Sequence, residues 1–472
     1  MQALRQVLNA KAGPGTRMLW APSADLTIRA MAGGSCLDGS PLTPVGQSVL
    51  VRTREQISAA KALVELDGLA RRLILCPPDL AEDHLPVVVR DGEVTMVVAD
   101  QIEMSPTLAA LPHLMIGDPH PCEPRPSGER ARTEWAMFTS GTTGPPKMVV
   151  HDLEGLTGAI KPADADNPPV WATFYDIRRY GGLQILLRGL LGGGSMVIAG
   201  SDEPMIDLIR RMGRHGVTRV SGTPSHWRKA LMSGAAQLLS PAYVRLSGEI
   251  ADQAILNLLK HAFPNAAVGH AYASTEAGVG FEVNDGLEGF PASLIDSQGG
   301  EVEMAVVDGS LRVRSGRTAA RYLGDDPPPL IDLDGFVDTG DMVELRDGRY
   351  HFAGRKSGVI NVGGLKVHPE EIEHVVNSHP MVQMSVAFGQ RNPITGMIVV
   401  AEVVLSQIGS ADAHEGDAQE RDAQERDEWA IRRDILAFCR SKLAAFKVPA
   451  KLRIVPSLRI TEGGKLLRER QP

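Results

Sequence analysis

The sequence predicts an α/β protein with a large N-terminal domain of mainly parallel βαβ-type sheets, a β-rich subdomain, and a small mobile α+β domain at the C-terminus. Three observations support this fold class. Apolar runs of strand length alternate with helical segments as far as Tyr272, which favours crossover connections and parallel strands. From about Asp296 the pattern changes to short strands and turns. After Lys356 it changes again, to mixed helices and strands.

The N-terminal alternation begins with the apolar run Ser48–Arg52, which indicates a buried strand. Thr53 and Gln56 have the spacing of a capping box, so a helix is expected from this point to about Leu66. A second strand is expected at Arg72–Cys76. One strand–helix–strand unit therefore lies near the start of the chain.

The same alternation returns between Pro204 and Tyr272. The expected helices cover residues 204–216, 225–232 and 255–263, and the expected strands cover residues 217–220, 243–248 and 266–272. Helices of this length between strands are typical of parallel sheets with right-handed crossovers.

The later part of the chain contains a predicted β-hairpin, Val302–Arg314, with Asp308 and Gly309 at its turn. We place the domain boundary after Arg355, which gives domains of residues 1–355 and 356–472. The second domain is expected to contain helices at 368–379 and 429–443, and strands at 384–389, 397–405 and 451–455. A charged stretch with a DAQER duplication, residues 411–428, is expected to be a solvated insertion, either disordered or an extended helix.

Composition excludes several classes of function. The 472 residues are 43% hydrophobic and 22% charged, as in ordinary globular proteins. The net charge of −8 argues against nucleic acid, so small molecules are the expected partners. No apolar run reaches the roughly 18 residues of a membrane span and no signal-peptide core is present, so a cytoplasmic location is expected. The four cysteines lack the spacing of metal ligands.

A loop rich in hydroxyl groups and glycine, TSGTTGPPK at Thr139–Lys147, lies between two predicted strands. Glycine amides, hydroxyls and a lysine suit a polyphosphate ligand. The spacing is not that of a P-loop, because Gly141 and Gly144 are only three residues apart and Met148 stands where a magnesium-binding hydroxyl would be. The composition alone leaves a simple polar turn as the alternative.

Together with this loop, four further segments resemble, in order and spacing, the adenylate-forming superfamily of acyl-CoA synthetases, adenylation domains and luciferases. They are YASTEAG (272–278), VDTGD (337–341), GRKSGVINVGGLKVHPEEIE (354–373) and GGKLLR (463–468). The sequence is most similar to the acid-CoA ligases. The resemblance implies that the protein uses ATP and Mg²⁺ to activate a carboxylic acid as an acyl adenylate, releasing pyrophosphate. The acyl group then passes to a pantetheine thiol, for which CoA is the leading candidate.

The resemblance also assigns residues to the nucleotide. It implies that the loop closes over the β- and γ-phosphates through Thr139, Ser140, Gly141, Thr142, Thr143, Gly144 and Lys147. The other implied ATP/AMP-binding residues are Gly248, Glu249, Tyr272, Ala273, Ser274, Asp341 and Arg355, with Tyr272 against the adenine and Asp341 on the ribose. The implied catalytic residues are Thr275 at the α-phosphate, Glu276 as the Mg²⁺ ligand, and Lys465 between the carboxylate and the α-phosphate.

In this superfamily the small domain rotates between the two half-reactions. The resemblance implies that Lys356 is the hinge and that Lys465 withdraws after adenylation. Gly363 and Gly364 are then expected to line the pantetheine tunnel, where bare backbone lets a thiol arm pass.

The acyl pocket is expected around Tyr180, Gly181, Gly182 and Ala271. An α-amino acid is not expected as substrate, because Tyr180 falls where amino-acid adenylation domains carry an aspartate; Asp176 is the nearest acid. Arg178 and Arg179 have two interpretations. Either they line the pocket and suit a second carboxylate, or both face solvent.

Three alternatives to an acid-CoA ligase stay open. A stand-alone adenylating enzyme would load an acyl or aryl carrier protein in place of CoA. A catalytically impaired protein would bind only nucleotide or acyl group, although Glu276, Asp341 and Lys465 argue against it. A luciferase-like oxygenase would consume oxygen or emit light.

Overall fold

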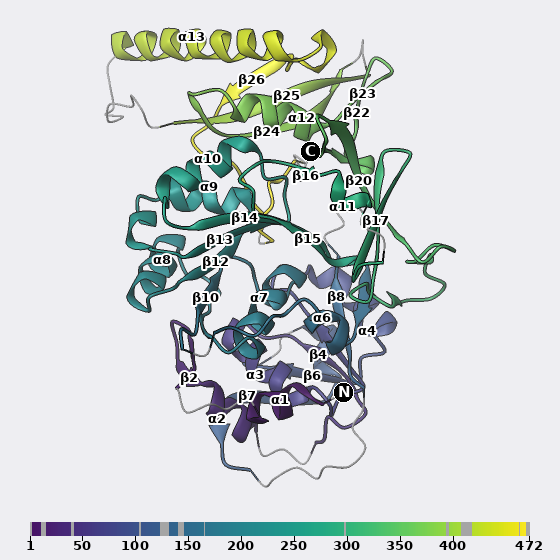
Figure 1. The fold of residues 1–472 in the computed structure, drawn as a ribbon. Helices are drawn as coiled ribbons and strands as arrows, with labels where there is room; N and C mark the ends of the chain where they lie inside the picture. The colour runs from purple at the N-terminus through teal and green to yellow at the C-terminus, as the bar shows by residue number, and fades with distance from the viewer. Residues whose placement is uncertain are drawn as a thin grey trace.

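The computed structural model describes residues 2–10, 16–38, 42–102, 105–122, 132–139, 146–164, 166–296, 299–392, 396–406, 418–461 and 463–468. Within these residues the strands form two 8-stranded sheets and three smaller sheets. Figure 1 shows the N-terminal elements at the bottom of the molecule and the C-terminal ones at the top. The α/β fold class is therefore confirmed. No helix in the described part of the chain combines the length and the apolar character that crossing a membrane requires.

One 8-stranded sheet has the order β19-β9-β8-β5-β4-β6-β7-β3. Its strands are β3 (Ser35–Leu37), β4 (Ser48–Val51), β5 (Arg72–Leu75), β6 (Met96–Ala99), β7 (His113–His120), β8 (Glu134–Phe138), β9 (Met148–His151) and β19 (Arg321–Tyr322). The five central strands are parallel, and the edge strands β3, β9 and β19 pair antiparallel. Both strands predicted near the start of the chain are confirmed.

The helix predicted between those strands is α3 (Gln56–Leu66), and its end at Leu66 is confirmed. The predicted capping box is wrong. The Thr53 hydroxyl donates to the carbonyl oxygen of Glu55 at 3.1 Å, and the Gln56 side-chain oxygen accepts a hydrogen bond from the Ile177 N–H at 2.9 Å. A contact with a distant part of the chain has taken the place of the local cap.

The other 8-stranded sheet has the order β15-β14-β13-β12-β10-β11-β1-β2. Its strands are β1 (Met18–Trp20), β2 (Asp25–Thr27), β10 (Val170–Thr173), β11 (Ser195–Val197), β12 (Arg219–Gly222), β13 (Tyr243–Ser247), β14 (Ala267–Ser274) and β15 (Gly278–Val283). Pairing is parallel except at β2 and β15. The strands predicted in the middle of the chain are confirmed, with ends shifted by a residue or two.

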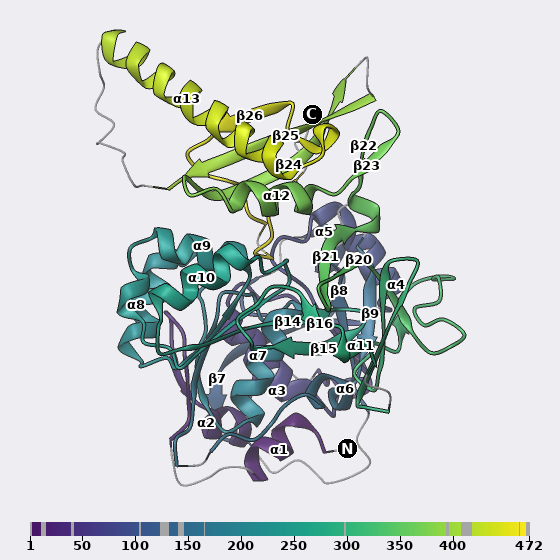
Figure 2. The same cartoon turned by 45° about the horizontal axis from the view of Figure 1, so that its top comes forward.

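Helices bury both faces of this second sheet. α7 (Tyr180–Leu191) and α3 belong to one apolar core that includes side chains of both large sheets, and Figure 2 shows the two helices near each other. α8 (Met205–Arg214), α9 (Pro224–Met232) and α10 (Gln253–Ala262) form a second core with β12 and β13. These three helices are the ones predicted from the alternation. The other α-helices described before residue 356 are α1 (Leu4–Ala10), α2 (Ile28–Gly33), α4 (Leu85–Asp91), α5 (Pro106–Ala109), α6 (Leu153–Thr157) and α11 (Ser293–Asp296).

The β-rich region is a 5-stranded antiparallel sheet in the order β16-β21-β20-β18-β17. Its strands are β16 (Phe290–Pro291), β17 (Val302–Val307), β18 (Ser310–Ser315), β20 (Val337–Arg346) and β21 (Arg349–Arg355). The predicted hairpin is confirmed as β17–β18. Its turn residues Asp308 and Gly309 have φ of 51° and 76°, the left-handed region that aspartate and glycine tolerate best.

The C-terminal part contains the hairpin β22 (Ile360–Val362) and β23 (Leu365–Val367) and a 3-stranded sheet of β24 (Val382–Asn392), β25 (Gly396–Leu405) and β26 (Lys451–Ile454). α12 (Pro369–Asn377) and α13 (Ala418–Lys442) pack here, and the predicted face of α12, Ile372, Val375 and Val376, is buried. α13 begins before the predicted Trp429, so part of the DAQER stretch is helical. Residues 411–417 of that stretch lie outside the described residues.

The C-terminal part contacts the second large sheet and its helices. Arg228 of α9 donates to the Gln383 carbonyl oxygen at 2.9 Å, and Asn377 of α12 donates to Asp252 at 3.4 Å. After β26 the chain descends as an extended segment, yellow in Figures 1 and 2, toward α9 and β14. The segment GGKLLR lies in this descending chain, so it is carried to the C-terminal edge of the parallel strands, where α/β proteins bind ligands.

Candidate active site

A tight hairpin presents Lys465. The Thr461 N–H donates to the Lys465 carbonyl oxygen and the Gly464 N–H donates to that of Thr461, both at 2.8 Å. The Lys465 N–H donates to the Thr461 hydroxyl at 3.2 Å, and Ile460 pairs with Leu466 across the hairpin. These bonds hold the backbone of Lys465, so the lysine side chain starts from a defined position.

Gly464 lies directly on the ring of His226 in α9. Its φ is 77°, and a Cβ at this position would be 1.9 Å from His226 Cε1. A larger residue would therefore lift the hairpin off the N-terminal part. Burial lowers the pKa of His226 to about 3, so the ring is neutral.

Lys465 reaches a point where four separately predicted motifs meet. Its Cε is 3.9 Å from the position that a Cβ on Gly248 would occupy. Burial lowers the pKa of the ammonium and the charge of Arg355 lowers it further, while the carboxylates of Glu249, Asp341 and Glu276 oppose this shift. The structure thus brings these predicted residues together around one cationic group.

Asp341 and Arg355 form an ion pair between β20 and β21, with Arg355 Nε 3.0 Å from Asp341 Oδ1. The Tyr272 hydroxyl donates to the other Asp341 oxygen at 2.7 Å. Phe281 and Phe352 stack on the Tyr272 ring with centroids 5.6 and 5.4 Å away. Burial and the Asp341 charge raise the pKa of Tyr272. Three residues predicted for the adenosine are therefore joined by direct contacts.

The turn that follows Tyr272 is held by His151 from β9. His151 Nε2 lies 2.7 Å from the Thr275 carbonyl oxygen, and burial lowers the pKa of the ring to about 4, so a neutral N–H donates. The Ser274 hydroxyl accepts from the Ala277 N–H at 2.9 Å. The Glu276 side chain stays half-buried with its charge acting on Lys465.

The polyphosphate loop is described only at its base, since Ser140, Gly141, Thr142, Thr143 and Gly144 lie outside the described residues. The Thr139 N–H donates to the Lys147 carbonyl oxygen at 2.9 Å and closes the loop between β8 and β9. The exposed Lys147 ammonium lies 5.5 Å from the Tyr322 ring centroid. Burial and the Glu276 charge raise the pKa of Tyr322 to about 12, so the loop base and Glu276 lie on the same side of the site.

The expected acyl-pocket residues lie at the start of α7 and in β14. Tyr180 is 5% exposed, and its hydroxyl faces the charges of Arg188 and Arg245. Gly182 is needed because a Cβ there would be 2.1 Å from a main-chain oxygen. Gly181 lies beside the Tyr175 ring, and Ala271 is buried in β14.

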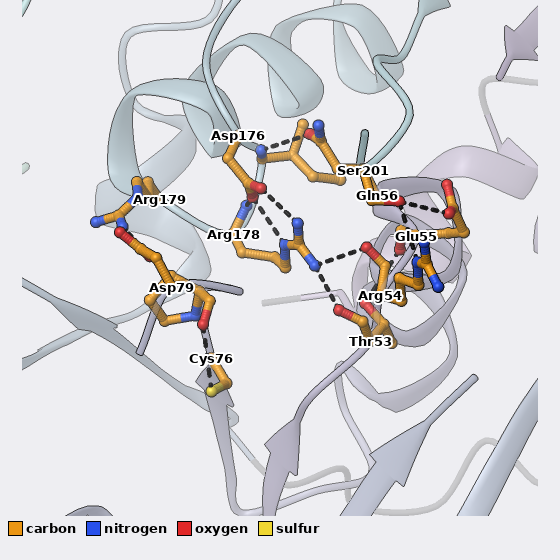
Figure 3. Close-up of polar contacts among 12 residues, drawn as sticks. Thr53, Arg54, Glu55, Gln56, Cys76, Asp79, Asp176, Arg178, Arg179 and Ser201 are labelled. Carbon is orange, nitrogen blue, oxygen red and sulfur yellow. Dashed lines mark hydrogen bonds and ion pairs between the residues drawn. The ribbon is translucent and has the colours of Figure 1, made fainter. Parts of the chain in front are cut away.

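The solvent-facing interpretation is wrong for Arg178, which is 1% exposed. Figure 3 shows its guanidinium between Asp176 and the chain before α3. Nε donates to Asp176 Oδ1 at 2.8 Å, and Nη1 donates to the carbonyl oxygens of Thr53 and Arg54. The buried Arg178 side chain therefore links the loop before α7 to the chain before α3. The Asp176 carboxylate is its counterion.

Arg179 pairs with Asp79, as Figure 3 also shows. Its Cδ is 3.7 Å from the position of a Cβ on Gly463, so it borders the Lys465 hairpin. Arg179 is partly exposed and its guanidinium pairs with Asp79, so it does not simply face solvent.

Sequence reasoning missed two neighbouring arginines, the partly buried Arg188 in α7 and the buried Arg245 in β13. The carboxylate nearest to them is Glu282, 3.6 Å from Arg245, and it also accepts a hydrogen bond from Tyr243. Arg188 Nε is buried with no hydrogen-bond partner among the described residues, and burial with the nearby Arg245 lowers its pKa to about 10. Positive charge exceeds negative charge here, which is costly unless an anion is bound.

Thr223, His226 and His151 were also missed. Thr223 and His226 form the capping box of α9, with His226 N–H donating to the Thr223 hydroxyl at 3.0 Å. The threonine-proline start of this helix is a signal for the cap. Nothing local shows that the same two residues meet a hairpin near the C-terminus.

The hinge and tunnel candidates lie away from the Lys465 hairpin. Lys356 is exposed and begins a short 3₁₀ turn directly after β21. Gly363 and Gly364 form the β22–β23 turn with φ of 58° and 89° and open space around them. In this arrangement Lys465, and not the glycine turn, is directed at the site.

Among the carboxylates of the site, Asp341 is engaged by Arg355 and Tyr272, and Glu276 is the one that the sequence predicts for a metal arriving with a nucleotide. Among the described residues, His, Cys, Asp and Glu side chains form no group of three or more that could hold a metal ion. Mg²⁺ commonly binds through one or two carboxylates together with substrate phosphates, so a single carboxylate fits it.

A partly buried lysine whose charge interacts with an aspartate–arginine–tyrosine cluster is the arrangement expected of an AMP-forming acid ligase of the acyl-CoA synthetase type. The sequence matches the family "AMP-binding enzyme" over residues 71–318 and the family "AMP-binding enzyme C-terminal domain" over residues 371–465. The chain belongs to the AMP-binding enzyme family. The resemblance and the enzyme class predicted from the sequence are confirmed.

Among curated proteins, the chain is similar to 2-succinylbenzoate–CoA ligases. It is 26% identical over 441 residues to that of Salmonella typhimurium, covering 91% of this chain and 87% of the relative. It is 25% identical over 351 residues to that of Listeria innocua, covering 72% and 70%.

Among solved structures, an anthranilate CoA ligase in complex with anthranoyl-AMP superposes with a TM-score of 0.78 at 19% identity, covering 98% of this chain and 95% of that one. A benzoate CoA ligase from Burkholderia xenovorans superposes with a TM-score of 0.77 at 17% identity, covering 99% of each chain. These likenesses confirm the fold.

Proposed function

We propose that the protein activates an aromatic acid that carries a second carboxylate, with 2-succinylbenzoate as the first candidate, and transfers it through an acyl adenylate to CoA. The observation that carries the substrate class is the excess positive charge of the partly buried Arg188 and the buried Arg245 between α7 and β13. Guanidinium groups form bidentate hydrogen bonds with carboxylates, so an anionic group of the substrate would pair with these two arginines. The names of the curated relatives favour the same class.

In the adenylation step, the Lys465 ammonium is proposed to lie between the attacking carboxylate and the α-phosphate. Both groups are anionic, so the step needs a cation at the charge that develops in the transition state. The hydrogen-bonded backbone of Lys465 and the partial burial of its side chain support this role, because a cation shielded from water interacts strongly with a phosphate.

Asp341 is proposed to accept the ribose hydroxyls, with Arg355 and Tyr272 holding its carboxylate in place. Thr275 and the loop from Thr139 to Lys147 are proposed to bind the phosphates. Glu276 is proposed to hold Mg²⁺ that enters with ATP. The ion would neutralise phosphate charge there.

Thioester formation is proposed to follow a rotation of the C-terminal domain, residues 356–472, about Lys356. The rotation would remove Lys465 and bring the Gly363–Gly364 turn to the site. A carrier-protein thiol remains the alternative acceptor, and an assay with and without CoA separates the two.

Replacing Arg188 by alanine should raise the KM for 2-succinylbenzoate by about 10- to 100-fold, since a hydrogen bond to a charged group is worth about 1.5–3 kcal/mol. The KM for benzoate, which lacks the second carboxylate, should change by less than about twofold. The measurement is pyrophosphate release from ATP and Mg²⁺ with each acid, with and without CoA.

The matched control is Arg210→Ala, because Arg210 lies on the exposed face of α8 in an ion pair with Asp207. It should leave both KM values unchanged. Equal effects of Arg188→Ala on the two acids would refute the substrate class, while release that CoA fails to sustain would assign the thiol to a carrier protein.

The adenylation rate should begin to fall at a lower pH than the ordinary lysine pKa of 10.5 would give. The pKa of Lys465 is lowered by burial from 10.5, and the neutral amine formed above this pKa has no charge to offer. Activity is therefore present below the lowered pKa and is lost as pH rises through it. A profile of kcat/KM for adenylation against pH measures this limb, and a limb at or above 10.5 would contradict an enclosed ammonium.

A further inference from the structure

One carboxylate joins the two halves of the site. Glu249 Oε2 accepts a hydrogen bond from the Ser225 N–H at 2.9 Å, and Oε1 accepts one from the Leu466 N–H, also at 2.9 Å. Ser225 is in the first turn of α9, and Leu466 directly follows Lys465 in the hairpin. Both oxygens of Glu249 are thus used on main-chain groups, one from each side of the interface.

A second bridge lies on the other side of Lys465. The Thr223 hydroxyl donates to the Gly464 carbonyl oxygen at 2.6 Å and accepts from the His226 N–H at 3.0 Å. The one proton of the Thr223 hydroxyl is therefore donated to the hairpin. Gly464 and Leu466 are the two neighbours of Lys465, so the backbone of the lysine is held from both sides.

We propose that Glu249 and Thr223 form a docking site for the Lys465 hairpin, and that Glu249 is a positioning residue for Lys465. The proposal rests on the proposed role of Lys465 in adenylation. The side chain of Glu249, expected from the sequence to contact the nucleotide, acts in this proposal through the hairpin.

The docking bonds exist only while the hairpin is inserted between α9 and the Gly248–Glu249 turn. When the C-terminal part moves away, the hydrogen bond between the Leu466 N–H and the Glu249 carboxylate breaks, and each group binds water instead. A hydrogen bond to a charged acceptor therefore biases the equilibrium toward the inserted state by about 10- to 100-fold. Removing it shifts the population away from the adenylating arrangement and leaves the other arrangement unaffected.

Hydrogen exchange of the full-length protein without substrates tests the docking directly. In Glu249→Ala, amides of the hairpin peptide 459–468 should exchange about 10- to 100-fold faster than in the unmodified protein. Glu249→Gln should be intermediate, because it keeps one acceptor oxygen. Unchanged exchange of this peptide in Glu249→Ala would overturn the proposal.

Glu288→Gln is the matched control, since Glu288 also meets the C-terminal part but does so at His374 of α12, 3.5 Å away. Its hairpin exchange should equal that of the unmodified protein. Acceleration as large as in Glu249→Ala would show a general loosening of the interface and would also overturn the proposal. Thr223→Val and Thr223→Ser give a second comparison, in which only valine should accelerate the hairpin.

The two half-reactions supply the functional test, with 2-succinylbenzoate, its adenylate and CoA as probes. Glu249→Ala should lower kcat of adenylation by about 10- to 100-fold with little change in the KM for ATP, and should leave thioester formation from supplied adenylate within about twofold. A raised KM for ATP with kcat retained would assign the side chain to the nucleotide instead. Normal adenylation in Lys465→Ala would defeat the proposed function, while the exchange experiment still decides the docking on its own.

Discussion

Adenylation by Lys465→Ala is expected to be at least about 100- to 1000-fold slower than by the unmodified protein, the usual loss when one preorganised group at a developing charge is removed. The cause is the absence of a cation where the carboxylate meets the α-phosphate. Thioester formation from a supplied acyl adenylate should be nearly unchanged, because the lysine is proposed to be withdrawn in that step. Pyrophosphate release and CoA-dependent consumption of adenylate measure the two rates separately.

Lys447→Ala serves as the control for this variant. Lys447 is also in the C-terminal part, where its ammonium lies 2.6 Å from Glu371, away from the hairpin. It should retain adenylation. If Lys465→Ala slowed both half-reactions equally, the assignment of the lysine to one of two arrangements would be wrong.

Lys356→Pro is expected to have the opposite effect, with adenylation retained and thioester formation reduced by about 100-fold or more if rotation at this residue is required. The proline ring would fix φ of residue 356 near −65°. The preceding residue, Arg355, already has φ of −91° and ψ of 141°, which a following proline accepts. Proline at position 356 is therefore compatible with the backbone of Arg355 in this arrangement. It should hinder the backbone rotation at residue 356 that would carry the C-terminal domain to the other arrangement.

Lys356→Ala separates backbone restraint from loss of the lysine charge, which lies near Asp338. It should support both half-reactions at close to normal rates. Unimpaired overall turnover by Lys356→Pro would show that the hinge lies elsewhere. It would also argue against a domain boundary directly after Arg355.

Much of the fold was predictable, because apolar periodicity and turn residues act locally. The Asp308–Gly309 hairpin and the buried face of α12 followed from patterns within about a dozen residues. The capping box at Thr53 failed because the Gln56 side chain found a better partner in the Ile177 N–H, 121 residues away. Local propensity holds no information about such a partner.

The candidate site was predictable in its members and not in its contacts. Four motifs named Glu276, Asp341, Arg355 and Lys465 separately, and the structure gathers the first three around the ammonium group of Lys465. The pairing of Arg178 with Asp176 and two backbone carbonyls was beyond sequence reasoning, as was the closeness of the Arg188 and Arg245 charges. Burial of a charged side chain depends on chain crossings that a single sequence does not show.

Because the Arg178 guanidinium bonds to both the loop before α7 and the loop before α3, the two loops should be kept together when this protein is recombined with a homologue. The bonds of Arg178 to Asp176 and to the Thr53 and Arg54 carbonyl oxygens join segments more than a hundred positions apart, and Gln56 adds the bond to Ile177. A chimaera that took residues 176–191 from a homologue without this arginine would remove Arg178 and Asp176 together, and would leave the carbonyl oxygens of Thr53 and Arg54 without their hydrogen-bond donor. Recombination breakpoints should therefore be chosen so that both segments come from the same parent.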